Sequence, residues 1–468
     1  MAGAVRIRDD VWKLSVGTLA AARTQPWDPV LDGYARGVEA MVARDDALTA
    51  DSWLWAANTH NAPPGTPANP MWKQCAHHKR FFLPWHRGYL AWFEATIQTL
   101  IGDDDWALPY WDYSDPNNPN ALKVPPEFKT DKRTVNGVLV DNPLFLSTQD
   151  RPGQPDPLDV DLLPAMTPRF FVRRPPATGF GGSDGPENRG GAVETQPHDF
   201  VHGDIGGGTG FMRTTTLAAR DPIFWLHHAN IDRLWEVWHK LPGSVELINQ
   251  GGVPAATVTE WNSAAFAFGD PGAPVVYQMH QLADTTADPL RYRYRDTDLP
   301  PNVLAAVTAR RQGGPMGLDE HTPRERRWDP LAATEGVDVG TDGAQRALQF
   351  DAGQLGLAGG VPSALVIELT GVRAAADCHN VYFVDVAARD GAPTHRAGRF
   401  STFGLSGTPA DEERDYVVDA SAAIPALVAD NWNGRGLVVA VSPDRESGGS
   451  SEGDDGIQIR QITVLSPR

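Results

Sequence analysis

Histidine clustering is the feature that most constrains how this chain can fold. Eight of its thirteen histidines fall in two short windows. They are His60, His77, His78 and His86 in the first window, and His198, His202, His227 and His228 in the second. Ordinary usage would put about one histidine in each window. Imidazole is a favoured ligand of copper, zinc, iron and nickel. The clustering therefore predicts a metal site that both windows face.

Charge and hydropathy limit the classes of partner. The chain has 468 residues and a formal net charge of -18, which disfavours nucleic acid and anionic lipid. No apolar run approaches the length of a membrane-spanning helix. We therefore expect small-molecule partners, with no nucleic acid and no membrane. Residues 1–15 lack the apolar segment of a signal peptide, so we expect a cytoplasmic protein, or one exported without a recognisable signal.

The sequence pattern divides the chain into three parts. Residues 1–255 read as helical segments joined by Pro/Gly-rich loops, and residues 256–345 read as a connector that packs on them. Residues 346–468 carry short β runs separated by turn residues, which is typical of an all-β sandwich or jelly roll. We therefore predict a mainly α domain followed by a C-terminal all-β domain.

In the second window, a helix places one histidine of the doublet inward. Asp221-Pro222 is a helix start, and Phe224, His228 and Ile231 then recur at helical spacing. His227 lies about 100° away around the helix. We predict that His228 is a metal ligand, while His227 lies behind the ligands.

The remaining histidines complete two sets of three. His198 and His202 are four apart, so both can lie on one helix face with His228 as a third ligand. In the first window, Pro84 can start a helix that Gly102 ends, and His86 is on its inward face. His60 would join His86, with either His77 or His78 as the third; periodicity does not decide between them. No carboxylate-rich ligand set accompanies the histidines, which favours copper or zinc over a di-iron site.

Four long motifs point to one family. They are His77-x8-His86 with Phe82-Leu83-Pro84-Trp85-His86-Arg87, Leu108-Pro109-Tyr110-Trp111-Asp112-Tyr113, His198-x3-His202-Gly203-Asp204, and Arg220-Asp221-Pro222-Ile223-Phe224-Trp225-Leu226-His227-His228. In these motifs the chain resembles the tyrosinase family, which includes tyrosinases, catechol oxidases and molluscan-type haemocyanins.

The resemblance implies a four-helix bundle that holds two copper ions. One copper would be bound by His60, His77 and His86, and the other by His198, His202 and His228. It also implies a type 3 copper phenol oxidase, which uses O2 to oxidise o-diphenols to o-quinones and hydroxylates some monophenols. An o-aminophenol oxidase and a haemocyanin-like oxygen carrier are the alternatives. The single short chain and the small residue Thr215 favour an enzyme.

Further residues gain expected roles from the resemblance. Cys75-Ala76-His77 matches the Cys-x-His arrangement in which some members form a thioether that fixes the imidazole. Glu194, four residues before His198, corresponds to a carboxylate that orients a water. Asp199 stands where many monophenol-hydroxylating members have Asn. A related position in plant enzymes holds a Phe over the first copper; here it is Thr215, so we expect an open entrance. Phe224 is expected to pack among the ligand imidazoles.

Overall fold

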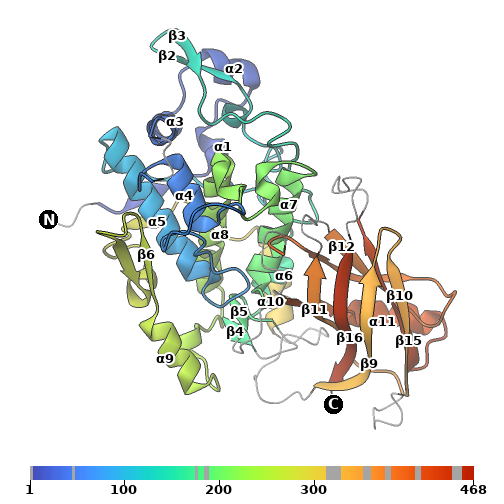
Figure 1. Ribbon diagram of the computed structural model, residues 1–468. Coiled ribbons are helices and arrows are strands. Elements are labelled where there is room, and N and C mark those ends of the chain that lie inside the picture. The colour runs from blue at the N-terminus through green and yellow to red at the C-terminus, as the bar shows by residue number, and fades with distance from the viewer. Residues whose placement is uncertain are drawn as a thin grey trace.

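A helical body and a β body lie side by side in the computed structural model, with the N-terminus on the helical side (Figure 1). The structure describes residues 4–44, 48–173, 178–183, 189–312, 328–351, 360–374, 381–405, 413–444 and 456–467. The predicted architecture, a mainly α domain followed by an all-β domain, is confirmed.

Helices dominate the chain up to residue 312. Their bounds are α1 Val11–Leu14, α2 Leu19–Thr24, α3 Pro29–Val42, α4 Trp53–His60, α5 Phe82–Ile101, α6 Leu163–Met166, α7 Phe200–Gly206, α8 Pro222–Lys240, α9 Ala255–Ser263, α10 Pro301–Arg311 and, within the β body, α11 Ile424–Ala429. Short strands accompany them: β1 Arg6–Arg8, β2 Lys132–Val135, β3 Val138–Asp141, β4 Val172–Arg173, β5 Gly182–Ser183, β6 Ala265–Phe268, β7 Val275–Gln278 and β8 Tyr292–Tyr294. Long α5 packs against both α3 and α8, and this packing forms the centre of the helical core.

Local sequence sets the ends of the two longest helices. Asp221 caps α8, because its carboxylate accepts the Ile223 N–H at 2.9 Å and is itself held by Arg151. Helix α5 ends at Gly102, whose φ of 69° is the left-handed conformation that glycine adopts without strain. Its start is Phe82, two residues before the predicted Pro84. This shift is small because proline fits the first helical turn.

The helix expected to carry His198 and His202 is irregular at its start. The segment Glu194–Asp199 is wound more widely than an α-helix and is kinked at Gln196, which has φ -146° and ψ 124°. Helix α7 follows directly. His198 lies after the kink, so it keeps its four-residue spacing to His202, and the two ring centroids are 4.6 Å apart.

A buried charge network joins the chain's N-terminus and the connector to the helical core. Arg8 of β1 donates to Glu94 at 2.9 Å and lies 3.5 Å over the ring of Tyr292. The hydroxyls of Tyr292 and Tyr294 both donate to Asp232 at 2.5 Å. Strands β1 and β8 pair in parallel beside this network. The connector is therefore packed into the helical domain.

The C-terminal body is a sandwich of two four-stranded sheets, with the orders β10-β15-β12-β13 and β14-β11-β16-β9. The strand bounds are β9 Trp328–Val339, β10 Ala344–Asp351, β11 Val366–Ala374, β12 Val381–Ala387, β13 His395–Ser401, β14 Arg414–Asp419, β15 Arg435–Pro443 and β16 Ile457–Pro467. Alternate residues of the strands, such as Leu369, Val384 and Val439, form its own apolar core.

The division at residues 255 and 345 stays a prediction. Strand β9 begins at Trp328 and pairs along β16, so the sandwich already starts before residue 346. Hydropathy gave no signal here, because β9 is largely polar or only partly buried. Val337 and Val339 of this strand are buried in the sandwich core, and Leu331 and Ala332 pack against it.

The interface between the helical body and the sandwich contains both ion pairs and a cavity. Arg399 of β13 pairs with Asp159 at 2.5 Å, and Arg189 pairs with Glu368 of β11 at 2.5 Å. Between the bodies lies a cavity of about 1320 Å³, to whose wall His78 contributes. Ion pairs therefore hold the sandwich against the face of the helical body that carries the second histidine window.

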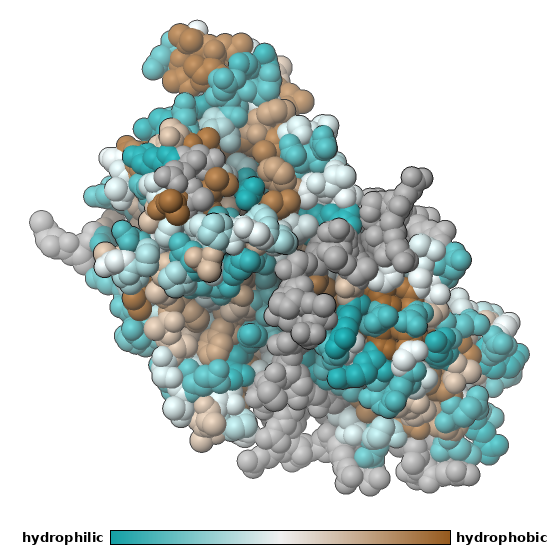
Figure 2. Space-filling view, in the orientation of Figure 1, coloured by the Kyte–Doolittle hydropathy of each residue, from teal (hydrophilic) through white to brown (hydrophobic). Residues whose placement is uncertain are grey.

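The outer surface has one apolar tip on the face shown in Figure 2. Val138 and Leu139 of β3 are 61% and 49% exposed, and the β2–β3 hairpin lies at the top of the molecule in Figures 1 and 2. Among the described residues, no helix combines the length and the apolar character needed to cross a bilayer.

We predict that the C-terminal end of α8 loses stability at alkaline pH. Burial opposes protonation of His239, but Glu236 and Glu246 outweigh it and raise the pKa of His239 to about 9. The stabilisation is complete below the unfolded pKa of about 6.5 and is lost as pH rises through about 9. Urea unfolding at pH 6 and pH 10 measures the free energy of unfolding of the wild type and of His239→Gln. The difference between the two proteins should be up to about 3 kcal/mol smaller at pH 10 than at pH 6, since a tenfold change in proton affinity corresponds to about 1.4 kcal/mol. An unchanged difference would contradict this assignment.

Candidate metal centre

Four helices bring the two histidine windows together. His60 ends α4, His86 lies in α5, His202 lies in α7 and His228 lies in α8. The rings of His86 and His228 stack across the centre, with centroids 4.3 Å apart and planes 13° apart. The two windows therefore form one continuous cluster in the helical core.

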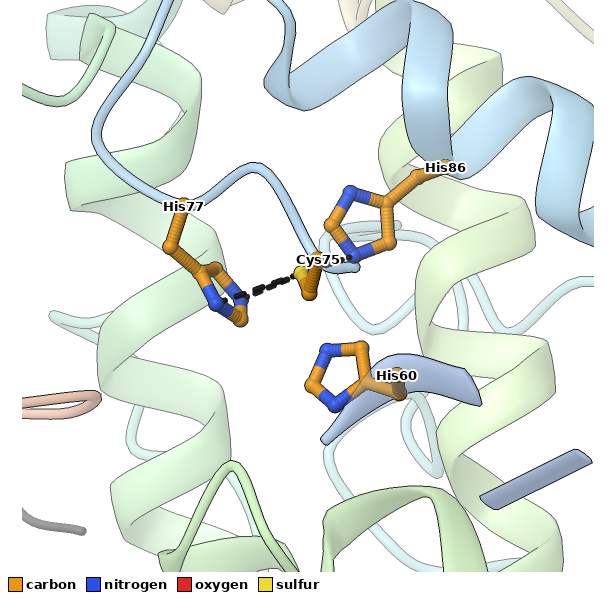
Figure 3. A group of neighbouring side chains, drawn as sticks. All are labelled: His60, Cys75, His77 and His86. Atoms are coloured by element: carbon orange, nitrogen blue, oxygen red, sulfur yellow. Dashed lines mark hydrogen bonds between the residues drawn. The ribbon is translucent and has the colours of Figure 1, made fainter. Parts of the chain in front are cut away.

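The first group consists of His60, Cys75, His77 and His86 (Figure 3). Their potential ligand atoms all lie within 4.8 Å of one another. Cys75 and His77 come from the loop before α5, and Figure 3 shows the cysteine sulfur between the His77 and His86 rings. The structure thus answers a question that periodicity left open, because His77 and not His78 joins this group.

The second group consists of His198, His202, His227 and His228, all fully buried. The Nε2 atoms of His202 and His228 are 3.2 Å apart. His227 stacks on His198 with ring centroids 5.3 Å apart. Among the residues that the structure describes, neither nitrogen of His227 has a hydrogen-bond partner. Both His227 and His228 therefore lie within the second group.

Hydrogen bonds orient four of the imidazoles. Backbone carbonyls accept from the Nδ1–H groups of His60, His86 and His202, at 2.9, 2.8 and 3.0 Å. The Asp199 carboxylate accepts from His198 Nδ1 at 2.8 Å. Each ring then carries its proton on Nδ1 and leaves Nε2 as a free electron-pair donor. The Nε2 atoms of His60 and His198 are buried and have no partner, which is the arrangement that a metal ion completes.

Burial keeps these imidazoles neutral. Burial lowers the pKa of His60 to about 4 and that of His227 to about 3. The pKa values of His77, His86, His198, His202 and His228 also lie well below 6.5, chiefly because of burial. A neutral imidazole is the form that binds metal, so no proton must be removed at neutral pH.

Cys75 Sγ lies close to the imidazole of His77. Its Sγ lies 3.2 Å from His77 Nδ1 and 3.5 Å from His77 Nε2. The ring carbon between these nitrogens is Cε1, so the sulfur faces that carbon. The same Sγ is 3.4 Å from His86 Nε2.

Two carboxylates and His78 form a third buried group next to the centre. His78, Glu194 and Asp199 have potential ligand atoms within 4.8 Å of one another. Glu194 Oε1 accepts the backbone N–H of His78 at 2.6 Å. Burial raises the pKa of Glu194 to about 8 and holds that of Asp199 well above its ordinary value. The sequence alone did not indicate that His78 belongs with these carboxylates.

The sandwich contributes one ring to the centre. Phe403 stacks on His202 with centroids 4.0 Å apart and planes 11° apart, and it also contacts the rings of His77 and His198. Arg414 of β14 holds this loop by donating to the carbonyls of Phe403 and Gly404. No sequence signal revealed Phe403, because its place depends on how the two domains dock.

Thr215 lies under this loop. It is 2% exposed, its carbonyl accepts from His60, and its hydroxyl accepts from Asn61 at 2.9 Å. A side-chain carbon built on Gly404 would lie 3.3 Å from the Thr215 methyl group. The open entrance expected at Thr215 is therefore not present, because the sandwich covers it. Phe224 lies within the cluster, with ring centroids 4.2 Å from His228 and 5.0 Å from His60.

Comparison with known proteins identifies the family. A family model described as the common central domain of tyrosinase matches residues 50–160 and 174–241. A tyrosinase of Streptomyces antibioticus is 31% identical over 221 residues, which cover 41% of this chain and 76% of that protein. This chain belongs to the tyrosinase family. The tyrosinase of Hahella sp. (strain CCB-MM4) is 34% identical over 292 residues, and the match covers 55% of this chain and 59% of that relative.

The fold of this tyrosinase-family chain extends the likeness over the sandwich. The structure of latent apple tyrosinase superposes with a TM-score of 0.56 at 19% identity, covering 100% of this chain and 98% of that one. The sequence matches are confined largely to the helical domain, whereas the structural match includes both bodies.

The residues present fit the two copper ions that tyrosinase-family proteins use. Each group offers at least three neutral imidazoles, all of them buried except the partly buried His77, and borderline nitrogen ligands suit copper. Unpartnered buried nitrogens would be costly without a ligand to satisfy them. We propose His60, His77 and His86 for one ion, and His198, His202 and His228 for the other.

We predict that His228→Ala lowers bound copper from about two ions per chain to about one. His227→Ala should retain more copper, because His228 and not His227 points its Nε2 at that of His202. Metal analysis after dialysis of both variants measures the difference, and the neighbouring positions on one helix make them a matched pair. The reverse order would show that the wrong member of the doublet was chosen.

We predict a thioether between Cys75 Sγ and His77 Cε1 in the copper-matured protein. Cε1 lies between the two nitrogens near Sγ, and the bond removes one hydrogen from each partner, with O2 at the copper-loaded site as the two-electron acceptor. Intact mass should therefore be about two hydrogens below the sequence mass, and the bond should fix the imidazole as an outer hydrogen bond does in other metal sites. Peptide mapping supplies an internal control, since Cys378, which lies outside the described residues, should be alkylated. Free alkylation of Cys75 would exclude the bond.

Proposed function

We propose that this chain is a copper-dependent phenol oxidase that converts o-diphenols to o-quinones and hydroxylates some monophenols. The observation that carries the proposal is the joined pair of buried histidine groups, whose rings stack at His86 and His228. Family membership supports copper as their metal. Phenols and O2 are the proposed small-molecule partners.

Bound copper would supply the electron transfer between the phenol and O2. Two diphenols give up four electrons and four protons in total, and one O2 accepts them to give two waters. The residues of the chain must orient the copper ligands, bind the aromatic ring of the substrate and accept protons.

Asp199 is proposed as a positioning residue for His198. Its carboxylate accepts the Nδ1–H of that ring at 2.8 Å, which fixes the tautomer and directs Nε2 at the metal. The resemblance linked this position to monophenol hydroxylation, because many hydroxylating members have Asn there. The hydrogen bond to His198 supports an action through the ligand instead.

Glu194 is proposed to hold a water that receives the phenol proton. An unperturbed phenol has a pKa of about 10, so hydroxylation near neutral pH requires a base. Glu194 Oε2 is buried and has no hydrogen-bond partner among the described residues, which leaves an acceptor for such a water. Positive charge on bound copper would favour the carboxylate form of this buried group.

Phe403 suggests where the substrate ring binds. Its phenyl group lies parallel to His202 at 4.0 Å, as a phenol ring would stack. Phe403 is 1% exposed, and its ring occupies the position proposed for the substrate ring. The same covering also favours a second candidate, an oxygen carrier, because a carrier needs access for O2 but none for phenols.

We predict that Phe403→Ala raises kcat/KM for catechol. Removing the ring opens the face of His202, and an aromatic pair contributes ~0.5–1.5 kcal/mol, so the gain should be roughly two- to tenfold. Phe383→Ala is the matched control, because Phe383 is another sandwich phenylalanine whose ring contacts Arg396, away from the histidines. Its catechol activity should stay at the wild-type level.

Parallel assays of Phe403→Ala with catechol, tyrosine and o-aminophenol separate the candidate functions. Faster oxidation of catechol than of the other two supports the proposed diphenol oxidase. Preference for o-aminophenol would favour that alternative. Copper-loaded variant protein that takes up and releases O2 without consuming any of these substrates would instead indicate a carrier.

A further inference from the structure

We propose that His78, Glu194 and Asp199 form a binding site for a third divalent cation, zinc, beside the copper pair. None of these three residues is among the proposed copper ligands. The inference concerns metal binding itself and does not depend on oxidase activity.

The spacing of the three side chains suits one small cation. All three can present a ligand atom within 4.8 Å of the other two. His78 Nε2 and Glu194 Oε1 are 3.7 Å apart, too far for a hydrogen bond but close to the separation of two ligands on one zinc ion. The group comes from three places in the chain, namely the loop before α5, the start of the kinked segment and its end.

Two polar atoms of this group are unsatisfied. His78, Glu194 and Asp199 are 5%, 0% and 1% exposed. His78 Nε2 and Glu194 Oε2 are both buried, and neither has a hydrogen-bond partner among the described residues. Buried polar atoms normally have a partner, and a shared cation would satisfy both atoms at once.

The local charge favours a cation as well. Two carboxyl groups lie together in the protein interior, and burial raises the pKa of both because their ionised forms are not fully compensated there. Arg414 is the cation that acts on both, but its guanidinium donates to the carbonyls of Phe403 and Gly404. A divalent ion between the carboxylates would supply the missing compensation.

Gly190 and the interdomain cavity leave room and a path for the ion. Both Gly190 and His78 line the cavity of about 1320 Å³. A side-chain carbon at Gly190 would lie 3.2 Å from both Glu194 Oε2 and His78 Nδ1, so the glycine leaves space beside the ligands. An ion could therefore enter from the cavity without passing the coppers.

The ligand set indicates zinc among common cations. Zinc accepts both imidazole nitrogen and carboxylate oxygen ligands, and in three-ligand protein sites a water completes its coordination. Calcium and magnesium prefer oxygen ligands alone. Because Glu194 belongs to this group, a bound zinc ion would compete with the water proposed for phenol deprotonation.

The test counts metals in the copper-loaded full-length protein. Equilibrium dialysis against zinc chloride, followed by elemental analysis, should give about one zinc per chain while both coppers are retained. His78→Asn removes the imidazole but suits the φ of 55° at this position, because Asn tolerates the left-handed region. It should weaken zinc binding roughly tenfold or more. His280→Asn, at an exposed histidine, is the matched control and should bind zinc normally.

Location is checked independently. Anomalous scattering at the zinc edge from soaked crystals should place the ion between His78 and Glu194, and Gly190→Ala should weaken its binding without removing a ligand. The proposal is overturned if zinc binds only by displacing copper, if His78→Asn binds as tightly as wild type, or if no zinc beyond surface sites is found. Loss of oxidase activity alone would bear on the proposed function and not on this site.

Discussion

The ion pair between Arg87 and Asp232 is the interaction on which the centre depends. Arg87 Nε lies 2.6 Å from Asp232 Oδ1, and both side chains are buried. Arg87 follows His86 in α5, and Asp232 lies one turn beyond His228 in α8. The pair thus holds α5 and α8 together at the level at which the rings of His86 and His228 stack. Removing one partner would leave an uncompensated buried charge, which is strongly destabilising.

Orientation of the ligands comes from the backbone more than from other side chains. Carbonyls of Thr215, Phe82 and Met212 accept from three imidazoles. Such acceptors keep their place when side chains change, since they belong to the fixed course of the chain. Asp199 is the side chain that performs this task for His198. A site oriented in this way is prepared for metal before the metal arrives.

The sandwich contributes side chains to the histidine centre of the helical domain. Phe403 lies on His202, and Arg414 both holds that loop and places a positive charge near Glu194 and Asp199. The ion pairs that dock the sandwich, such as Arg399 with Asp159, therefore also determine how covered the histidine centre is. In this protein, a change in how the sandwich docks on the helical domain would therefore also change access to the histidine centre.

The sequence by itself determined the helices and the inward histidines. Helical periodicity and capping placed His86 and His228 on buried faces, since those signals act within a few residues. The motifs identified the family. Only the tertiary structure decided that His77 joins the first group, that His78 meets Glu194, and that Phe403 covers His202. These contacts join loops and domains far apart in the chain, and their geometry follows from packing and charge pairing that no local pattern encodes.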